Sequence, residues 1–150
     1  SAFKVYQQTK AAAVKIEGGA SKANIIKALT SNSIAVMGHI GLMPQFVRSE
    51  GGYKVKGKDD DNILSLIKDA KAIEEAGAFS IVVEGVKPDA AKAITNAVNI
   101  PVIGIGAGKD VDGQVLVWSD MFGFFEDFKP KFVRQYLNGA KLIKDSLKQF

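Results

Sequence analysis

Residues 79–86 read Phe-Ser-Ile-Val-Val-Glu-Gly-Val, an apolar run that ends in a glutamate and a glycine. Residues 12–19 read Ala-Ala-Val-Lys-Ile-Glu-Gly-Gly and end in the same way. A carboxylate within a buried strand is costly, because an unpaired charge loses its water. At the C-terminal end of a parallel strand it is expected, because α/β folds build their sites there. The two runs therefore predict strands whose ends, Glu17 and Glu84, belong to one site.

Five apolar segments have the length and composition of buried strands: residues 12–17, 34–38, 79–84, 101–106 and 114–118. Helical patterns separate most of them. Apolar strands that alternate with helices predict a parallel sheet covered on both faces. The link between the last two strands is too short for a helix, because a crossover needs about 10–12 residues. The expected fold class is α/β.

Helical spacing is found in residues 21–30, 61–77, 88–98 and 131–147, and residues 2–11 read as the end of a further helix. Ser21 is a candidate N-cap. The helix that begins at Asp61 has one apolar face, and Gly77 is expected to end it. Pro88 and Pro130 lie where helices are expected to begin, which is the position at which a helix accepts proline.

The composition indicates one ordinary globular domain over residues 1–150. The chain is 47% hydrophobic, which is enough to form a core. It has no cysteine, which excludes disulfides and Cys-ligated zinc within it and fits a cytoplasmic protein. No apolar run reaches the roughly 20 residues that span a bilayer, and no apolar leader is visible. The net charge is +4 with dispersed lysines, so neither a membrane nor a nucleic acid is an expected partner.

Three strand-associated side chains are candidates for a site. Lys15 and Glu17 alternate along one strand and share a face. They form either an ion pair or a Mg²⁺-ligating carboxylate beside an ammonium that holds an anionic substrate; Mg²⁺ usually takes one or two protein carboxylates. Glu84 follows three apolar residues and is either a general base for a carbon-bound proton or a partner of Lys87. His39, the only histidine, follows the strand 34–38, and both a site role and a structural role are open.

Two loops add further candidates. Residues 39–58 have little regular pattern and carry an aromatic and basic set, Tyr53, Lys54, Lys56 and Lys58. Such a long loop is either a lid over a ring-bearing anionic ligand or solvated surface. The glycine-rich turn at 104–108 suggests a phosphate site or a close backbone approach to any ligand, but it lacks the spacing of the known phosphate-binding motifs.

Seven blocks of the sequence are specific in content and order: Val-Lys-Ile-Glu-Gly-Gly (14–19), Met-Gly-His-Ile-Gly-Leu-Met-Pro-Gln (37–45), Gly-Gly-Tyr-Lys-Val-Lys-Gly (51–57), Glu-Glu-Ala-Gly-Ala-Phe (74–79), Val-Glu-Gly-Val (83–86), Ile-Pro-Val-Ile-Gly-Ile-Gly-Ala-Gly (100–108) and Asp-Gly-Gln-Val-Leu-Val-Trp (112–118). Over about residues 11–133 the chain resembles the ketopantoate hydroxymethyltransferase family. The resemblance implies a (β/α)₈ TIM barrel of the phosphoenolpyruvate-utilising type. Such barrels have about 250 residues, so about five βα units are expected here, as the C-terminal portion. The first three strands are absent, and with them two aspartates that in the family hold metal and substrate.

The resemblance also implies an activity. The family transfers a one-carbon unit from 5,10-methylenetetrahydrofolate to 3-methyl-2-oxobutanoate, giving 2-dehydropantoate for pantothenate and coenzyme A synthesis, with Mg²⁺ and as a homo-oligomeric decamer. By this resemblance Glu17 would ligate Mg²⁺, Lys15 and His39 would bind the keto acid, and Glu84 would accept the proton that leaves a Mg²⁺-stabilised enolate. A related Mg²⁺-dependent lyase or mutase for a phosphorylated keto acid, and an inactive fragment, are the alternatives. The 150-residue chain alone is expected to be inactive. Its exposed sheet edges are expected to need a complementing fragment, a partner copy, or refolding into an open sheet.

Overall fold

The computed structural model describes residues 2–48 and 51–150 of the chain. Its residues group into two compact units, which divide between Gln114 and Val115. The single domain expected over residues 1–150 stays a prediction. Across the described residues, no helix combines the length and the apolar character that crossing a bilayer requires.

The first unit is built on a parallel five-stranded sheet. Its strands are β1 (Val14–Glu17), β2 (Val36–Gly41), β3 (Ser80–Glu84), β4 (Val102–Ile105) and β5 (Gly113–Gln114). They pair in chain order, β1-β2-β3-β4-β5. A doubly wound sheet reverses its strand order, whereas a barrel adds each new strand on the same side of the last. The sheet is therefore consistent with part of a (β/α)₈ barrel, as expected.

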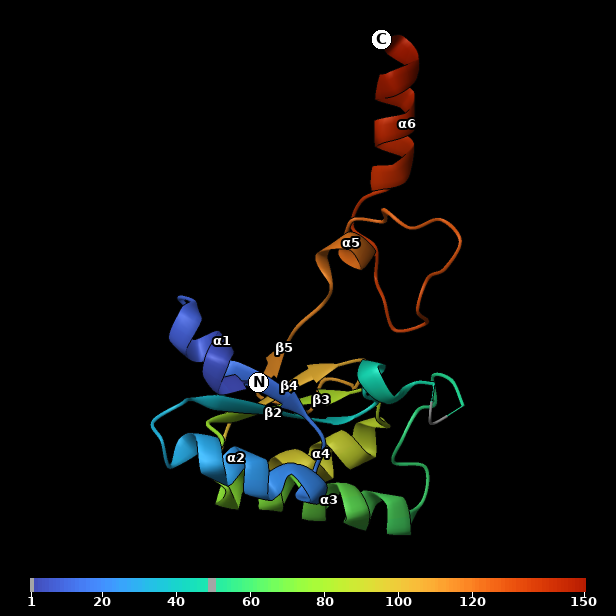
Figure 1. Cartoon of the computed structure of the whole chain (residues 1–150). Helices are drawn as coiled ribbons and strands as arrows, with labels where there is room; N and C mark the ends of the chain where they lie inside the picture. The colour runs from blue at the N-terminus through green and yellow to red at the C-terminus, as the bar shows by residue number, and fades with distance from the viewer. Residues whose placement is uncertain (1, 49–50) are drawn as a thin grey trace. The chain divides into compact units, whose positions relative to one another are not determined.

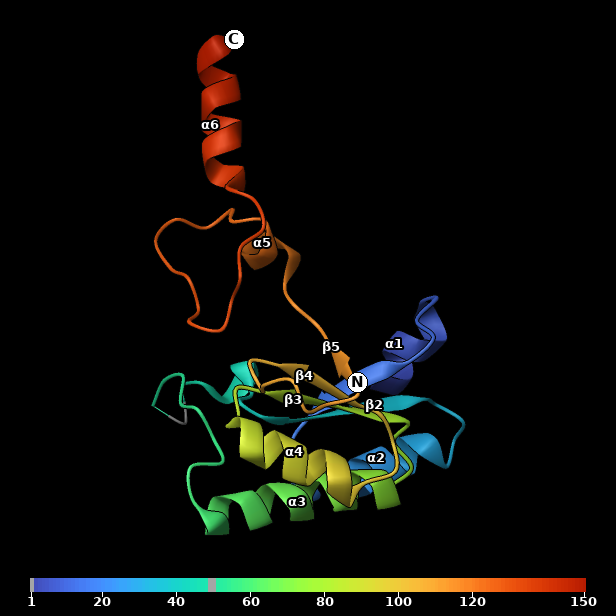
Figure 2. The same ribbon diagram turned by 180° about the vertical axis from the view of Figure 1, so that it is seen from behind.

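Four α-helices accompany this sheet: α1 (Ala2–Gln8), α2 (Ala23–Thr30), α3 (Asp60–Glu75) and α4 (Pro88–Ala97). The three crossover helices α2, α3 and α4 lie together on one side of the sheet (Figure 1, Figure 2). Right-handed crossovers between successive neighbouring strands place their helices on the same face. The expectation of a sheet covered on both faces is therefore wrong for the crossover helices.

The core fills the space between the sheet and these helices. It is made of fully buried strand and helix residues, including Val36, Ile40, Ile81, Val83 and Val102 from the strands and Ile26, Ile73 and Ile94 from the helices. Burying each such side chain stabilises the fold by about 1.5–3 kcal/mol. Because side chains alternate along a strand, the residues between these core positions face the other side of the sheet.

Local signals explain most helix ends of the first unit. Asp59 caps α3, since its Oδ1 accepts a hydrogen bond of 2.8 Å from the Asn62 N–H. Gly77 follows the last turn with a φ of +90°, and Pro88 opens α4, both as expected. Ser21 is not an N-cap. It lies in the 3₁₀ turn η1 (Ala20–Lys22), which precedes α2.

The second unit, Val115–Phe150, contains α5 (Trp118–Met121) and α6 (Gly139–Gln149). The strand expected at 114–118 is wrong beyond Gln114, because β4 offers β5 only two register partners, Ile103 and Gly104. The helix expected at 131–147 begins instead at Gly139. The backbone before it bonds elsewhere, for example through the Tyr136 N–H to the Met121 carbonyl at 2.9 Å.

Candidate active site

The two glutamates lie at strand ends, as the sequence predicts. Glu17 is the last residue of β1 and Glu84 the last residue of β3, with β2 between them. Glu17 is in register with His39, and Glu84 with Gly41, two residues further along β2. All three side chains therefore face the side of the sheet opposite the crossover helices.

His39 connects the two carboxylates. Its Nδ1 is 3.8 Å from Glu17 Oε1, and its Nε2 is 3.3 Å from Glu84 Oε2. The same Nε2 is 3.1 Å from the Leu42 carbonyl oxygen. The side chain of His39 is only 1% exposed, that of Glu17 is 8% exposed and that of Glu84 is 22% exposed. The fold thus brings three of the four predicted site residues together, with the buried imidazole of His39 between the carboxylates of Glu17 and Glu84.

Glycines hold the two strand ends in place. Gly18 has a φ of +125° and Gly85 a φ of +57°, a region that favours glycine. The Gly18 N–H donates to the His39 carbonyl and the Gly85 N–H to the Ile105 carbonyl, both at 2.9 Å. The predicted sharp turn after each glutamate is confirmed, and each turn ties its strand end to the neighbouring strand.

Neither structural ion pair considered from the sequence is formed. Lys15 is exposed and makes no ion pair with Glu17, although strand alternation places both on one face. Glu84 likewise makes no ion pair with Lys87, and its charged neighbour is His39 instead. Lys15 is the one predicted site residue that the structure does not bring into contact with the others.

Glu17 has one carboxylate oxygen engaged by backbone. Its Oε2 accepts a hydrogen bond of 3.2 Å from the Gln45 N–H, in the 3₁₀ turn η2 (Pro44–Phe46). Within residues 2–48 and 51–150, no three acidic, histidine or cysteine side chains form a group that could hold a metal ion. A single carboxylate is nevertheless a usual protein contribution to a Mg²⁺ site. Glu17 therefore fits the metal as one ligand, with its Oε1 as the donor that no N–H engages.

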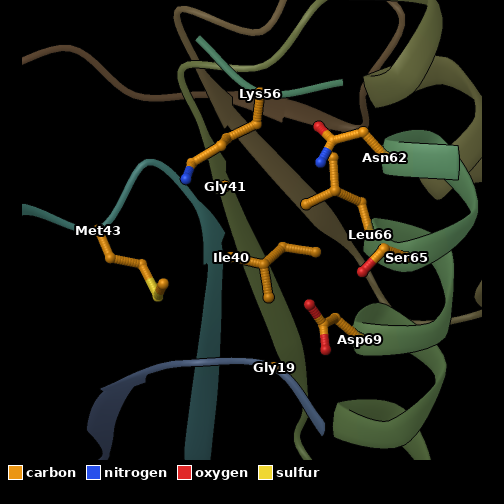
Figure 3. Close-up of a pocket in the computed structure, with 9 residues that line it drawn as sticks. All are labelled: Gly19, Ile40, Gly41, Met43, Lys56, Asn62, Ser65, Leu66 and Asp69. Carbon is orange, nitrogen blue, oxygen red and sulfur yellow. The ribbon is translucent and has the colours of Figure 1, made fainter. Parts of the chain in front are cut away.

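A cavity of about 220 Å³ lies on the helix-covered side of the sheet, between the loops after β1 and β2 and the first half of α3 (Figure 3), and Glu17, His39 and Glu84 do not line it. Asn62, Ser65 and Asp69 extend from α3 toward it, and Lys56 and Met43 come from the loop after β2. Asp69 Oδ1 accepts a hydrogen bond of 2.8 Å from the Ala20 N–H. The three α3 residues were not predicted. Their spacing of three and four residues indicates a shared face, but polar residues at this spacing are usually solvated.

The long loop is anchored at its C-terminal end. β2 extends through His39 to Gly41, so the irregular part begins later than expected. The Lys56 N–H donates to the Gly85 carbonyl, and the Lys87 N–H donates to the Lys56 carbonyl, each at 3.0 Å. Tyr53 is 73% exposed. The loop thus joins the end of β3, whereas its role as a lid stays a prediction; Ser49 and Glu50 lie outside the described residues.

The glycine turn after β4 serves packing. Gly108 has a φ of +83°, and a Cβ atom there would lie 2.8 Å from the Cβ of Pro88, the first residue of α4. Packing against Pro88 thus requires glycine at position 108, and the phosphate site and the backbone approach to a ligand both stay predictions.

Residues 1–150 match the family described as ketopantoate hydroxymethyltransferase. The chain belongs to this family. The 3-methyl-2-oxobutanoate hydroxymethyltransferase of Aliarcobacter butzleri is 73% identical over 146 residues, which are 97% of this chain and 54% of that protein. The proteins of the same name from Nitratiruptor sp. and Helicobacter pylori are 63% and 55% identical over the whole chain and 56% of their own length.

The chain spans about half the length of the curated relatives it matches. Family membership confirms the resemblance seen in the seven sequence blocks. The placement of this chain as the C-terminal portion stays a prediction, as do the individual roles of Lys15, Glu17, His39 and Glu84.

Proposed function

We propose that this chain forms part of an enzyme that transfers a hydroxymethyl group to 3-methyl-2-oxobutanoate, with 5,10-methylenetetrahydrofolate as the one-carbon donor. The product would be 2-dehydropantoate, an intermediate of pantothenate and coenzyme A synthesis. The names of the relatives support the acceptor and the reaction type. The family resemblance further suggests a cytoplasmic homo-oligomer, with a decamer as the expected assembly.

The observation that carries the proposal is the pair of strand-end carboxylates joined by His39. Glu84 is the expected base, because its side chain combines partial exposure with a fixed neighbour. It would take the proton from C3 of the keto acid, next to the carbonyl, and leave the electron pair as an enolate. That carbon then forms a bond to the one-carbon unit, both bonds of that unit to folate nitrogens break, and water supplies the hydroxyl oxygen. The proton taken by Glu84 and the proton released by water go to the two nitrogens, which leaves tetrahydrofolate.

Glu17 is the expected metal-side residue. Mg²⁺, when bound, would polarise the 2-oxo group and make the C3 proton more acidic. Glu17 would supply one carboxylate oxygen, with further ligands from water and from chain outside these 150 residues. Lys15 is exposed on the same face, two residues earlier, and would attract the carboxylate of the keto acid.

The test uses this chain alone and the chain assembled with the part of the Aliarcobacter butzleri relative that it does not match, here named the completed enzyme. Product is measured by mass spectrometry with 3-methyl-2-oxobutanoate, 5,10-methylenetetrahydrofolate and Mg²⁺. We expect 2-dehydropantoate from the completed enzyme and none from the chain alone. A completed enzyme that forms no 2-dehydropantoate but turns over phosphonopyruvate would replace this proposal with the lyase or mutase alternative.

A further inference from the structure

His39 is too deeply buried to be a substrate ligand. Its side chain is 1% exposed, although the sheet ends in two open edge strands, β1 and β5. The carboxylates of Glu17 and Glu84 lie on either side of it, and both are more exposed than the imidazole. A keto acid that approached the C-terminal ends of the strands would therefore contact the carboxylates of Glu17 and Glu84 before it reached the imidazole.

The contacts of His39 determine which ring nitrogen carries the proton. Nε2 has two groups within reach, the Leu42 carbonyl oxygen at 3.1 Å and Glu84 Oε2 at 3.3 Å. A carbonyl and an ionised carboxylate can only accept hydrogen bonds, so Nε2 must be the donor. Nδ1 is buried and has no hydrogen-bond partner among the described residues. An apolar side chain would fill the same space without burying an unpaired nitrogen. The contribution that only histidine makes here is therefore its Nε2–H donor.

The two contacts of Nε2 lie where hydrogen bonds join the ends of β2 and β3. The Leu42 N–H donates to the backbone carbonyl of Glu84 at 2.7 Å, while the Leu42 carbonyl faces His39 Nε2. Gly41, with a φ of +93°, turns the chain so that Leu42 can do both. Leu42 thus holds the backbone of Glu84, while His39 Nε2 lies 3.3 Å from one oxygen of its carboxylate.

We propose that His39 is a positioning residue, whose Nε2–H is held at the Leu42 carbonyl and lies against Glu84 Oε2, so that it orients that carboxylate for proton abstraction, and that it does not bind the keto acid. This rests on the proposed function, in which Glu84 is the base. An imidazole that holds one carboxylate oxygen reduces the number of orientations the carboxylate samples. Reactivity depends on such alignment, since a displacement of about 1 Å can lower a rate by about 100-fold.

Two substitutions separate the ring nitrogens. In His39→Gln the amide nitrogen reaches roughly the position of Nε2 and can still donate to Glu84, whereas in His39→Asn it falls near Nδ1 and cannot. In the completed enzyme we expect kcat to fall by about 100-fold in H39N and by about threefold in H39Q, with the KM for 3-methyl-2-oxobutanoate nearly unchanged in both. A rise in KM at constant kcat, or equal losses in the two variants, would overturn the proposal.

A second measurement needs neither a variant nor activity. Because His39 is the only histidine, a ¹⁵N-histidine-labelled 150-residue chain has a single imidazole to observe. At alkaline pH, where imidazoles are neutral, we expect the proton on Nε2 and a bare Nδ1. A proton on Nδ1, or the averaged shifts of an exposed ring, would disprove the hydrogen bond. Absence of transfer by the wild-type completed enzyme would instead count against the proposed function alone.

Discussion

Gly41→Ala is expected to loosen the link between β2 and β3 more than any exposed glycine substitution. Gly41 has a φ of +93°, which costs a residue with a side chain about 1–2 kcal/mol. A Cβ atom there would lie 2.2 Å from the backbone oxygen of Glu84, which is closer than atoms can approach. Relief requires that oxygen to move, and it accepts the Leu42 N–H at 2.7 Å. Losing that hydrogen bond adds about 1 kcal/mol, so about 2–3 kcal/mol is expected in total.

Gly52→Ala is the matched control. Gly52 also has a positive φ, +110°, but no atom of residues 2–48 and 51–150 lies within 4 Å of its added Cβ. It carries the conformational cost of about 1–2 kcal/mol without the collision. Equilibrium urea unfolding of the 150-residue chain, followed by far-UV circular dichroism, gives both free energies of unfolding. Equal free energies of unfolding for G41A and G52A would contradict the close approach of Gly41 to the Glu84 carbonyl oxygen.

Three further substitutions test the site and the fold. In the completed enzyme, Glu84→Gln is expected to lower kcat by about 10²–10⁴-fold while Mg²⁺ affinity, measured by calorimetry, stays near wild type, because a general base is lost; retained turnover would exclude Glu84 as the base. Glu17→Gln is expected to raise the Mg²⁺ concentration for half-maximal activity, because one anionic ligand is lost; an unchanged Mg²⁺ dependence would leave Glu17 with its contacts to Gln45 and His39 and no role at the metal. Asp59→Ala is expected to destabilise the chain by about 1 kcal/mol in urea unfolding, because it removes the cap of α3; unchanged stability would show that the cap contributes nothing.

Local sequence signals predicted the sheet and most helices of the first unit. The strand ends at Glu17 and Glu84 were recognisable because an apolar run, a carboxylate and a glycine are all local features. The end of α3 at Gly77 and the start of α4 at Pro88 were recognisable for the same reason, since each depends on the backbone of one residue. In the second unit the turn signal at Pro130 gives only one turn, in which the Val133 N–H donates to the Pro130 carbonyl. No helix continues from it, because the Tyr136 N–H then donates to the Met121 carbonyl near α5.

The candidate site likewise divides into features that local sequence signals predicted and features that they missed. Glu17, His39 and Glu84 were singled out separately, each from its place after an apolar run. No local pattern indicates which of them touch, because that depends on strand order and register: β2 lies between β1 and β3, and His39 is opposite Glu17. The cavity residues Asn62 and Asp69 were missed, because a polar helix face that lines a cavity has the same sequence pattern as one in water.

By itself, the sequence determined the fold class, the family and the two carboxylates at strand ends, because these follow from apolar periodicity, glycine positions and motif order. Only the tertiary structure decided that His39 is buried between those carboxylates and that its Nε2 faces Glu84 and Leu42. It also decided that the crossover helices share one face of the sheet. The physical reason is that side-chain contacts between strands depend on register and crossover direction, which join residues far apart in the chain.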